Sequence, residues 1–308
     1  MHWLDALSIR WLKRQPIFGG GWGELREAEA FADSLRTPTP GKALELTWGP
    51  IRRESALSVQ DGTAPSPAEI LPAKLRTLHV RRILTPRKAV RRLIVPPSWG
   101  DAGYGPRMWL AGALVARGIE VWLLEGAYFG QRHAEMTQVE DFFRMGLGHI
   151  EEVRALLETH HQAGLATAVA GYSMAGQLGS MAVQSVPYDV PVVAMACAPS
   201  PDTVFVEGPL AQQVQWPTLG DGAREQLARV MKRVSVLDQP KPTSSQRAVV
   251  LNRDDGIVAP DATRRIAAHW NVEPLELSTG HVGAYTLHRR TLQRVIGDTL
   301  LSGQKLEG

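Results

Sequence analysis

Residues 165–186 read LATAVAGYSMAGQLGSMAVQSV, and this stretch decides the fold. It begins with a short apolar run that ends at Val169. Such a run is typical of a strand covered on both faces, because covered strands lose the polar alternation of a half-exposed sheet. Small residues follow, and then Leu178, Met181 and Ala182 lie on one side of a helical pattern. The stretch therefore predicts a buried strand that turns sharply into a helix.

The turn carries a single serine, Ser173, between Gly171 and Ala175. A serine on a sharp strand-to-helix turn projects its hydroxyl above the sheet edge, as in the G-x-S-x-G nucleophile elbow of α/β-hydrolases. Gly171 supplies the first glycine of that motif, whereas Ala175 replaces the second with a residue one methyl larger. The pattern predicts a nucleophilic serine. The alternative is a turn of small residues that only lets the helix pack close to the sheet.

The composition argues against several other classes of protein. The chain of 308 residues has 34 basic and 31 acidic side chains, a net charge of +3, and no dense basic block. Nucleic-acid binding is therefore not indicated, and at most weak attraction to anionic surfaces is expected. The single cysteine, Cys197, allows no intrachain disulfide and no multi-cysteine zinc site. Because it lies in an apolar run, we predict a buried, inert thiol, and we expect no metal and no cofactor.

The first 18 residues place Trp3, Leu4, Leu7 and Trp11 at helical spacing. Aromatic and basic residues also occur in helices that lie on a membrane surface, but we favour a helix packed on its own domain. No segment resembles a secretory signal, and no uncharged run is long enough to span a bilayer. We therefore expect a cytoplasmic protein, with peripheral association at a membrane as the alternative.

The remaining chain alternates between predicted strands and helices. Strand-like stretches between residues 43 and 83 are typical of leading antiparallel strands, and from residue 91 short buried strands alternate with helices. This alternation implies a mostly parallel central sheet with helices on both faces, within a single domain over residues 1–308. Residues 199–246 form an unusually long connection, and such connections are usually functional. With its helical stretch 223–236, we expect this insertion to cap the strand ends.

Candidate partners for Ser173 follow later predicted strands. Asp254 and Asp255 follow the segment AVVLN, and His281 follows PLELS in a glycine-flanked turn. Ligands of α/β sheets bind beyond the carboxyl ends of the strands, and the chain order serine, aspartate, histidine is that of the α/β-hydrolase fold. We predict that His281 accepts the serine proton and that Asp255 orients its imidazole. Asp255 precedes Val258 as in the usual acid loop of this fold, and Asp254 is the alternative.

An acyl-transfer site also needs backbone N–H donors for the developing oxyanion. We expect the first from Met174, which directly follows the serine, and the second from the loop after strand 93–95. The two residues that follow this strand are prolines, which have no N–H. The second donor is therefore expected from Ser98 or Trp99.

The sequence resembles the alpha/beta-hydrolase domain-containing protein 18 family almost from end to end. The resemblance is carried by GGGWG near the start, the WGD loop at 99–101, EGAYFGQR at 125–132, GYSMAG at the serine, PDTVFVEGPL at 201–210, RDDGIV and TGHVGAY. The family usually has two glycines after serine-methionine, so Ala175 is a departure. The resemblance implies a serine hydrolase with Ser173, Asp255 and His281 as its triad, and it points toward lipid substrates. The long insertion before the acid is shorter here than in long animal members of the family.

Two further residues match family positions in a loop beside the site, Tyr128 and Arg132. They are candidates for recognising an anionic group such as a phosphate, because arginine forms paired hydrogen bonds with oxyanions. The equal alternative is that Arg132 braces its own loop.

We therefore predict a serine hydrolase that cleaves a carboxylic ester, with a small molecule or a lipid as substrate. A thioester or amide substrate is the nearest alternative, and a non-catalytic hydrolase-like binding protein is the alternative from another class. The sequence does not set the oligomeric state. In the cap, apolar residues are expected to line an acyl pocket. A basic stretch there would draw the protein toward anionic lipid, unless it is a solvated amphipathic helix; its members are Arg224, Arg229, Lys232 and Arg233.

Overall fold

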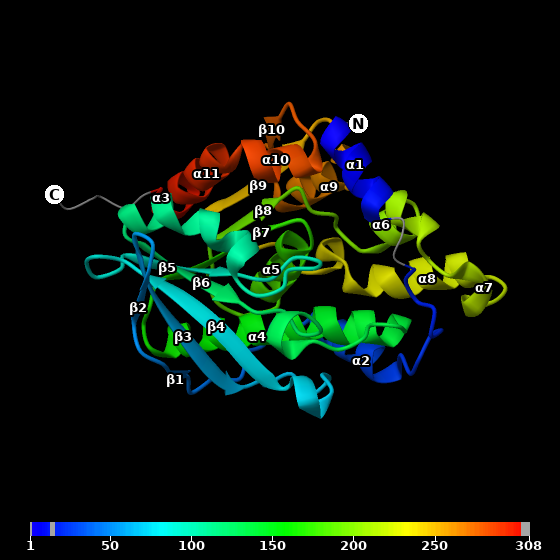
Figure 1. Cartoon of the computed structure of the whole chain (residues 1–308), viewed down its shortest axis with the longest axis horizontal. Helices are drawn as coiled ribbons and strands as arrows, with labels where there is room; N and C mark the ends of the chain where they lie inside the picture. Colours follow the sequence, from blue (N-terminus) through cyan, green and yellow to red (C-terminus); the bar gives the residue numbers. More distant parts are fainter. Residues whose placement is uncertain (1, 13–15, 303–308) are drawn as a thin grey trace.

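A ten-stranded sheet forms the centre of the protein in the computed structural model, which describes residues 2–12 and 16–302 (Figure 1). Its strand order is β1-β3-β4-β6-β5-β7-β8-β9-β10, and β2 pairs with β3 outside this path. The strands are β1 (Thr47–Trp48), β2 (Arg52–Glu54), β3 (Leu57–Pro65), β4 (Thr77–Leu84), β5 (Arg91–Val95), β6 (Ile119–Leu124), β7 (Thr167–Tyr172), β8 (Val192–Met195), β9 (Arg247–Asn252) and β10 (Leu275–Leu277).

The sheet has an antiparallel edge and a parallel centre, as the sequence predicts. Strands β1 to β4 pair antiparallel, and β4 joins β6 antiparallel. From β6 to β10 all neighbours are parallel. Every residue of β6 and β8 is buried, and all of them are apolar except Glu120 of β6, which accepts a hydrogen bond from Trp122 Nε1. Strands β3 and β4 mix buried and partly exposed residues because they lie toward the sheet edge.

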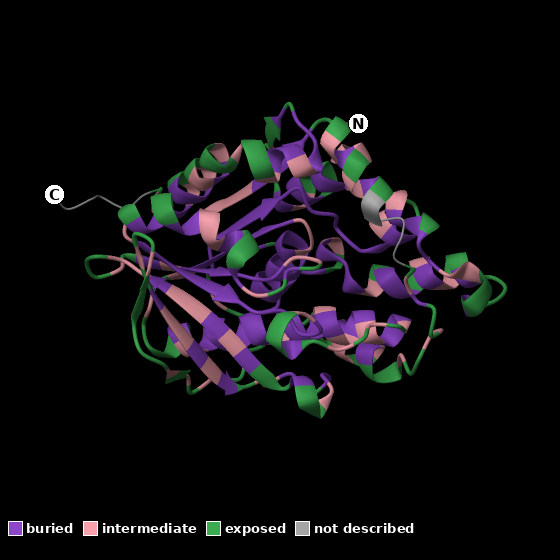
Figure 2. Ribbon diagram, viewed as in Figure 1, coloured by how far each residue is buried: buried purple, intermediate pink, exposed green. Residues whose placement is uncertain are grey.

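Helices cover both faces of the sheet and create a separate apolar core on each (Figure 2). Helices α3, α10 and α11 pack on one face, and α4, α5 and α9 pack on the other. The helices are α1 (Trp3–Leu12), α2 (Arg26–Ser34), α3 (Ala111–Ala116), α4 (Val139–Gln162), α5 (Met174–Gln184), α6 (Asp202–Phe205), α7 (Trp216–Leu219), α8 (Ala223–Met231), α9 (Pro260–Trp270), α10 (His281–Leu287) and α11 (Arg289–Leu301). The predicted α/β-hydrolase fold is confirmed.

The predicted cap segment, residues 199–246, connects β8 to β9 through the short helices α6, α7 and α8. The helix predicted over 223–236 is shorter than expected, because α8 ends at Met231 and continues as the 3₁₀ turn Lys232–Val234. The chain after α1 lies against this segment: Ile17 donates to Gln213 O at 2.9 Å and accepts from Gln215 N at 3.0 Å. The 3₁₀ turn Pro209–Gln212, which follows α6, packs against α1.

The basic stretch of the cap is largely paired within the protein. Arg233 forms ion pairs with Glu29 and Asp33 of α2, at 3.5 and 2.6 Å. Lys232 lies 3.7 Å from the buried carboxylate of Asp202. Arg224 stacks over the Trp216 ring at 4.7 Å, and Arg229 is exposed. Part of this basic stretch is therefore held by contacts within the protein, and attraction of the stretch to anionic lipid stays a prediction.

Helix α1 packs on the domain through a face that its sequence pattern does not indicate. Trp3 and Leu7 are 64% and 55% exposed, whereas Asp5 and Ile9 are buried. The predicted contribution of Trp11 falls on a side chain outside those that the structure describes. Within the described ranges, no helix has the length and apolar composition that crossing a bilayer requires.

Candidate active site

The serine predicted as nucleophile stands on a strained turn between β7 and α5. Ser173 has φ 58° and ψ −130°, a backbone conformation that residues other than glycine rarely adopt. Its N–H donates to Met195 O of β8 at 2.8 Å, which holds the turn against the sheet. A Cβ at Gly171 would overlap the backbone of Ala175, so the first glycine of the motif is required by space. Ala175 is 2% exposed and fits without a glycine at its position.

An aspartate–histidine pair lies beyond the ends of the last two strands, β9 and β10. Nδ1 of His281, the first residue of α10, lies 2.8 Å from Oδ2 of Asp255. The other oxygen of Asp255 accepts from the N–H of Ile257 at 2.9 Å and of Val258 at 2.8 Å. These bonds aim the carboxylate at the imidazole, whereas Asp254 is exposed. The geometry thus pairs His281 with Asp255, the residue preferred from the sequence.

The surroundings of His281 raise the pKa of its imidazole. Burial by itself would lower this pKa, because it disfavours the charged ring. The charge and hydrogen bond of Asp255, together with the charge of Asp5, outweigh burial and raise the pKa above the ordinary histidine value. An imidazole in this environment is well suited to accept a proton, because the imidazolium that results is stabilised.

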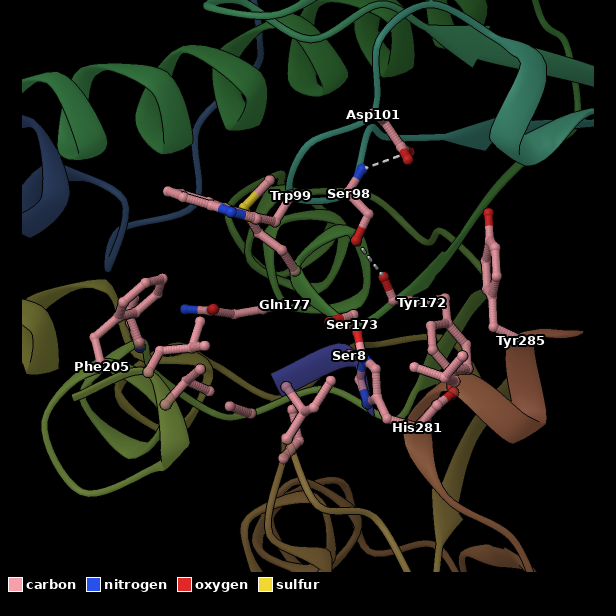
Figure 3. A pocket seen from close by; sticks show the side chains of 18 of the residues that line it. Ser8, Ser98, Trp99, Asp101, Tyr172, Ser173, Gln177, Phe205, His281 and Tyr285 are labelled. Carbon is pink, nitrogen blue, oxygen red and sulfur yellow. Dashed lines mark hydrogen bonds between the residues drawn. The ribbon is translucent and has the colours of Figure 1, made fainter. Parts of the chain in front are cut away.

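Ser173 and His281 line the same pocket, which has a volume of about 300 Å³ (Figure 3). Most of the lining is apolar and comes from the loop after β5, from α4, from the segment after β8 and from the acid loop. These apolar residues are Trp99, Phe142, Met174, Ala198, Pro201, Val204, Phe205, Leu210, Ile257, Val258 and Val282. An apolar cavity with few polar groups is the usual form of a small-molecule site.

Of the two predicted oxyanion donors in the loop after β5, Ser98 forms a hydrogen bond within the loop, whereas Trp99 remains a candidate. Ser98 N donates to Asp101 Oδ2 at 3.0 Å, so this N–H is not free for an oxyanion (Figure 3). Ser98 Oγ donates to Tyr172 O at 3.2 Å. The prediction that Ser98 supplies the second oxyanion donor is therefore wrong. The N–H of Trp99 remains the candidate donor from this loop. The N–H of Met174 belongs to the first turn of α5, where amides have no intrahelical acceptor.

Tyr128 and Arg132 lie outside this pocket, which corrects their predicted role in substrate binding. The Arg132 side chain is 2% exposed and forms a paired salt bridge with Glu152 at 2.6 and 3.0 Å. Its remaining hydrogen bonds go to Leu75 O and Glu125 O. Together with the Glu152 salt bridge, these bonds use all five N–H donors of the guanidinium. Arg132 therefore braces its loop. Tyr128 is 2% exposed and donates to Asp141 Oδ1 at 3.2 Å.

Helix α1 brings two residues to the site that sequence reasoning missed. Ser8 lines the pocket, and the buried Asp5 accepts hydrogen bonds from Gly256, His281 and Val282. An acidic residue in the first turn of a helix is common for electrostatic reasons, so its position gave no signal of a distant partner. Within the described residues, no cluster of three or more metal-binding side chains occurs.

Comparisons with known structures agree with the observed fold. An acetyl xylan esterase from a Paenibacillus species superposes with a TM-score of 0.63 at 13% identity, covering 92% of this chain and 97% of its own. Acetyl xylan esterase 1 from a Thermoanaerobacterium species gives 0.57 at 13% identity, with 93% and 97% covered. An α/β serine hydrolase without lid from Xanthomonas campestris gives 0.52 at 14% identity, with 86% and 96% covered. At these identities the likeness concerns the fold alone.

Among curated proteins, no sequence matches the chain significantly. The sequence profile of the family described as alpha/beta hydrolase domain containing 18 matches residues 15–230, more than half of the chain and including Ser173. The resemblance identified from the motifs is thereby confirmed. The chain belongs to the alpha/beta hydrolase domain containing 18 family and is, by that membership, a hydrolase of the α/β-hydrolase fold.

Proposed function

We propose that the protein is a serine hydrolase that cleaves carboxylic esters through an acyl-enzyme. The observation that carries this proposal is the convergence of Ser173, on its strained elbow, and the His281–Asp255 pair on one apolar pocket. A strained backbone conformation costs stability, and such conformations cluster at active sites and ligand-binding sites. A non-catalytic binding protein would have no use for this arrangement.

In the proposed reaction, Ser173 Oγ attacks the ester carbonyl carbon while His281 accepts the hydroxyl proton. The N–H groups of Met174 and Trp99 hold the oxyanion of the tetrahedral intermediate. The bond to the alcohol oxygen then breaks, and His281 returns its proton to that oxygen. Water attacks the acyl-enzyme in the same way and releases the carboxylic acid and free Ser173.

The pocket supports an ester with an apolar acyl group as substrate, and a lipid ester belongs to that class. Aromatic contacts dominate one wall, where the Trp99 ring lies 5.7 Å from Phe142 and 5.5 Å from Phe205. A thioester or amide could be cleaved by the same groups, because the chemistry at the carbonyl is shared. The apolar lining favours an ester over an amide as substrate, since it offers few polar partners for an amide N–H.

A fluorophosphonate probe tests the proposal, because it reacts with activated serines. We expect labelling of the wild type at Ser173, identified by mass spectrometry, and none in Ser173→Ala. Ser8→Ala is the matched control, since Ser8 lines the same pocket and its removal should leave the label in place. Folded protein without Ser173-dependent labelling would instead favour the binding protein. Esters of increasing acyl length, in solution and in vesicles, then give the substrate range.

A further inference from the structure

We propose that Asp5 of α1 is a positioning residue for the catalytic base and its acid loop, so that the N-terminal helix is a working part of the active site. This inference rests on the function proposed above. Asp5 is fully buried, accepts a hydrogen bond from the backbone N–H of His281, and is not among the residues that line the pocket. It touches none of the reacting atoms and acts through the loops that carry them.

One carboxylate joins two loops that are separate in sequence. Oδ2 of Asp5 accepts from Gly256 N, beside the acid, and from His281 N, each at 2.8 Å. Oδ1 accepts from Val282 N at 2.9 Å. The amides of His281 and Val282 begin α10 and have no intrahelical acceptor, so Asp5 supplies one. The distance between the acid loop and the base loop is thereby fixed by a third element.

The three donors require a carboxylate and not merely a polar side chain. An amide in the same place has one oxygen and one NH₂ group, so at least one backbone N–H would face another donor. A buried charge is costly unless it is hydrogen-bonded, and the three amides meet that cost at Asp5. Helix α1 accordingly turns an acid inward while Trp3 and Leu7 face solvent.

The fit between α1 and the base loop is close. A Cβ at Gly280 would lie 2.5 Å from Asp5 Oδ2, so the missing side chain at this position lets the carboxylate reach the loop. Next to it, His2 N donates to Asp254 O at 3.0 Å. The His2–Asp254 hydrogen bond, the carboxylate of Asp5 and the pocket-lining Ser8 together tie the N-terminal segment to the site.

The charge of Asp5 also acts on the imidazole. The titratable and charged groups around His281 come from several elements. They are Asp255 from the acid loop, Asp5 from α1, His2 just before α1, Tyr172 from β7 with its ring 5.1 Å away, Tyr285 from α10, and Asp101 of the same pocket, which is ion-paired with Arg107 at 2.9 Å. Of these, Asp255 and Asp5 raise the pKa of His281. Removing the Asp5 charge is therefore expected to lower that pKa.

The test compares wild type, Asp5→Asn and, as matched control, Arg10→Gln on the exposed face of the same helix. Displacing a catalytic group slightly costs up to about 100-fold in rate, so we expect Asp5→Asn to lose about 10- to 100-fold in kcat with little change in KM. The acid limb of its pH profile should move to lower pH. Arg10→Gln should match the wild type in all three quantities.

Two measurements distinguish positioning of His281 by Asp5 from a contribution of Asp5 to the stability of the fold alone. Rates are normalised to the concentration of fluorophosphonate-reactive sites, and the His281 ring is titrated by NMR, with His281→Gln to assign its signal. Folded Asp5→Asn with wild-type kcat per site and an unchanged His281 pKa would overturn the inference. If Asp5→Asn does not fold, Asp5→Glu carries the test, because it keeps the charge but displaces it by one methylene. Wild-type kcat in that variant would equally overturn the inference.

The same design distinguishes this inference from the proposed function. Absence of Ser173 labelling in the wild type would refute the hydrolase proposal. The titration of His281 in wild type and Asp5→Asn needs no activity, so it would still decide whether Asp5 acts on the histidine.

Discussion

At the scale of single residues, the site depends on conformations and charges that are unfavourable elsewhere. Ser173 adopts a positive φ in the middle of well-packed structure, and His281 is buried next to two carboxylates. Each departure has a local cause. The turn from β7 into α5 forces the first, and the loops after β9 and β10 create the second.

The strain at Ser173 should be measurable as stability. Glycine tolerates φ 58° without penalty, whereas alanine keeps the strain and loses only the hydroxyl. We expect Ser173→Gly to be more stable than Ser173→Ala by about 1 kcal/mol, with both inactive. Denaturant unfolding of the two variants gives the difference. Equal free energies of unfolding would show that relief of strain at this position does not exceed the conformational entropy that glycine adds to the unfolded chain.

The two neighbouring aspartates should differ sharply. Asp255 bonds to His281 Nδ1, whereas Asp254 is exposed. We expect Asp255→Asn to lower kcat by about 10⁴-fold, because an amide stabilises the wrong imidazole tautomer. Asp254→Asn is the control and should cost far less. Similar losses in both variants, at unchanged stability, would contradict the assignment of the acid.

At the scale of elements, buried acids fix the loops that extend from the strand ends. Asp101 holds the loop after β5 through Ser98 N, and Asp5 holds the loops that carry Asp255 and His281. The segment after β8 contributes a different property, the shape of the pocket. Its short helix α6 and the following turn place Val204, Phe205 and Leu210 in the lining.

Helix α6 should therefore set the accepted acyl length. Val204 is partly exposed in the pocket, so it can be exchanged with little cost to the core. We expect Val204→Phe to lower kcat/KM for esters with longer acyl chains and to leave kcat/KM for acetate esters unchanged. Each methylene that the pocket excludes costs about 1–3 kcal/mol of transition-state binding. Val204→Ala should shift the preference in the opposite direction. A chain-length series of chromogenic esters measures both, and an unchanged profile would remove Val204 from the acyl site.

At the scale of the whole molecule, a buried ion pair connects regions far from the chemistry. Arg132 follows β6, Glu152 lies in the middle of α4, and the carbonyl of Leu75 precedes β4. This bracing joins the antiparallel edge of the sheet to a helix on its face.

The bracing role of Arg132 predicts a loss of stability without a loss of chemistry. Breaking one partner of a buried pair leaves an uncompensated charge, so Arg132→Ala should lower the free energy of unfolding by about 3–5 kcal/mol. Turnover per reactive site and KM should stay near wild type. The exposed Arg229→Ala is the control and should change stability by less than about 0.5 kcal/mol. A raised KM at unchanged stability would restore a substrate-binding role for Arg132.

The sequence by itself determined the features that arise from neighbouring residues. The elbow at Ser173 follows from small residues between an apolar run and a helical pattern, and the parallel sheet follows from the alternation of strands and helices. The order of serine, acid and base along the chain predicted His281 and an aspartate after AVVLN, and the spacing to Val258 favoured Asp255 over Asp254. These signals are local because backbone sterics and burial periodicity act over a few residues.

The tertiary structure alone decided which groups are occupied by distant partners. Whether the N–H donors of Arg132 are free to bind a substrate depends on Leu75 and Glu152. Whether α1 contributes to the site depends on loops more than 250 positions away in the sequence, at Gly256 and His281. No pattern within α1 reveals this, since its apolar residues indicate a face that the fold exposes. Hydrogen bonds between remote segments are set by how the whole chain packs, and that packing brings Asp5 to the backbone N–H of His281.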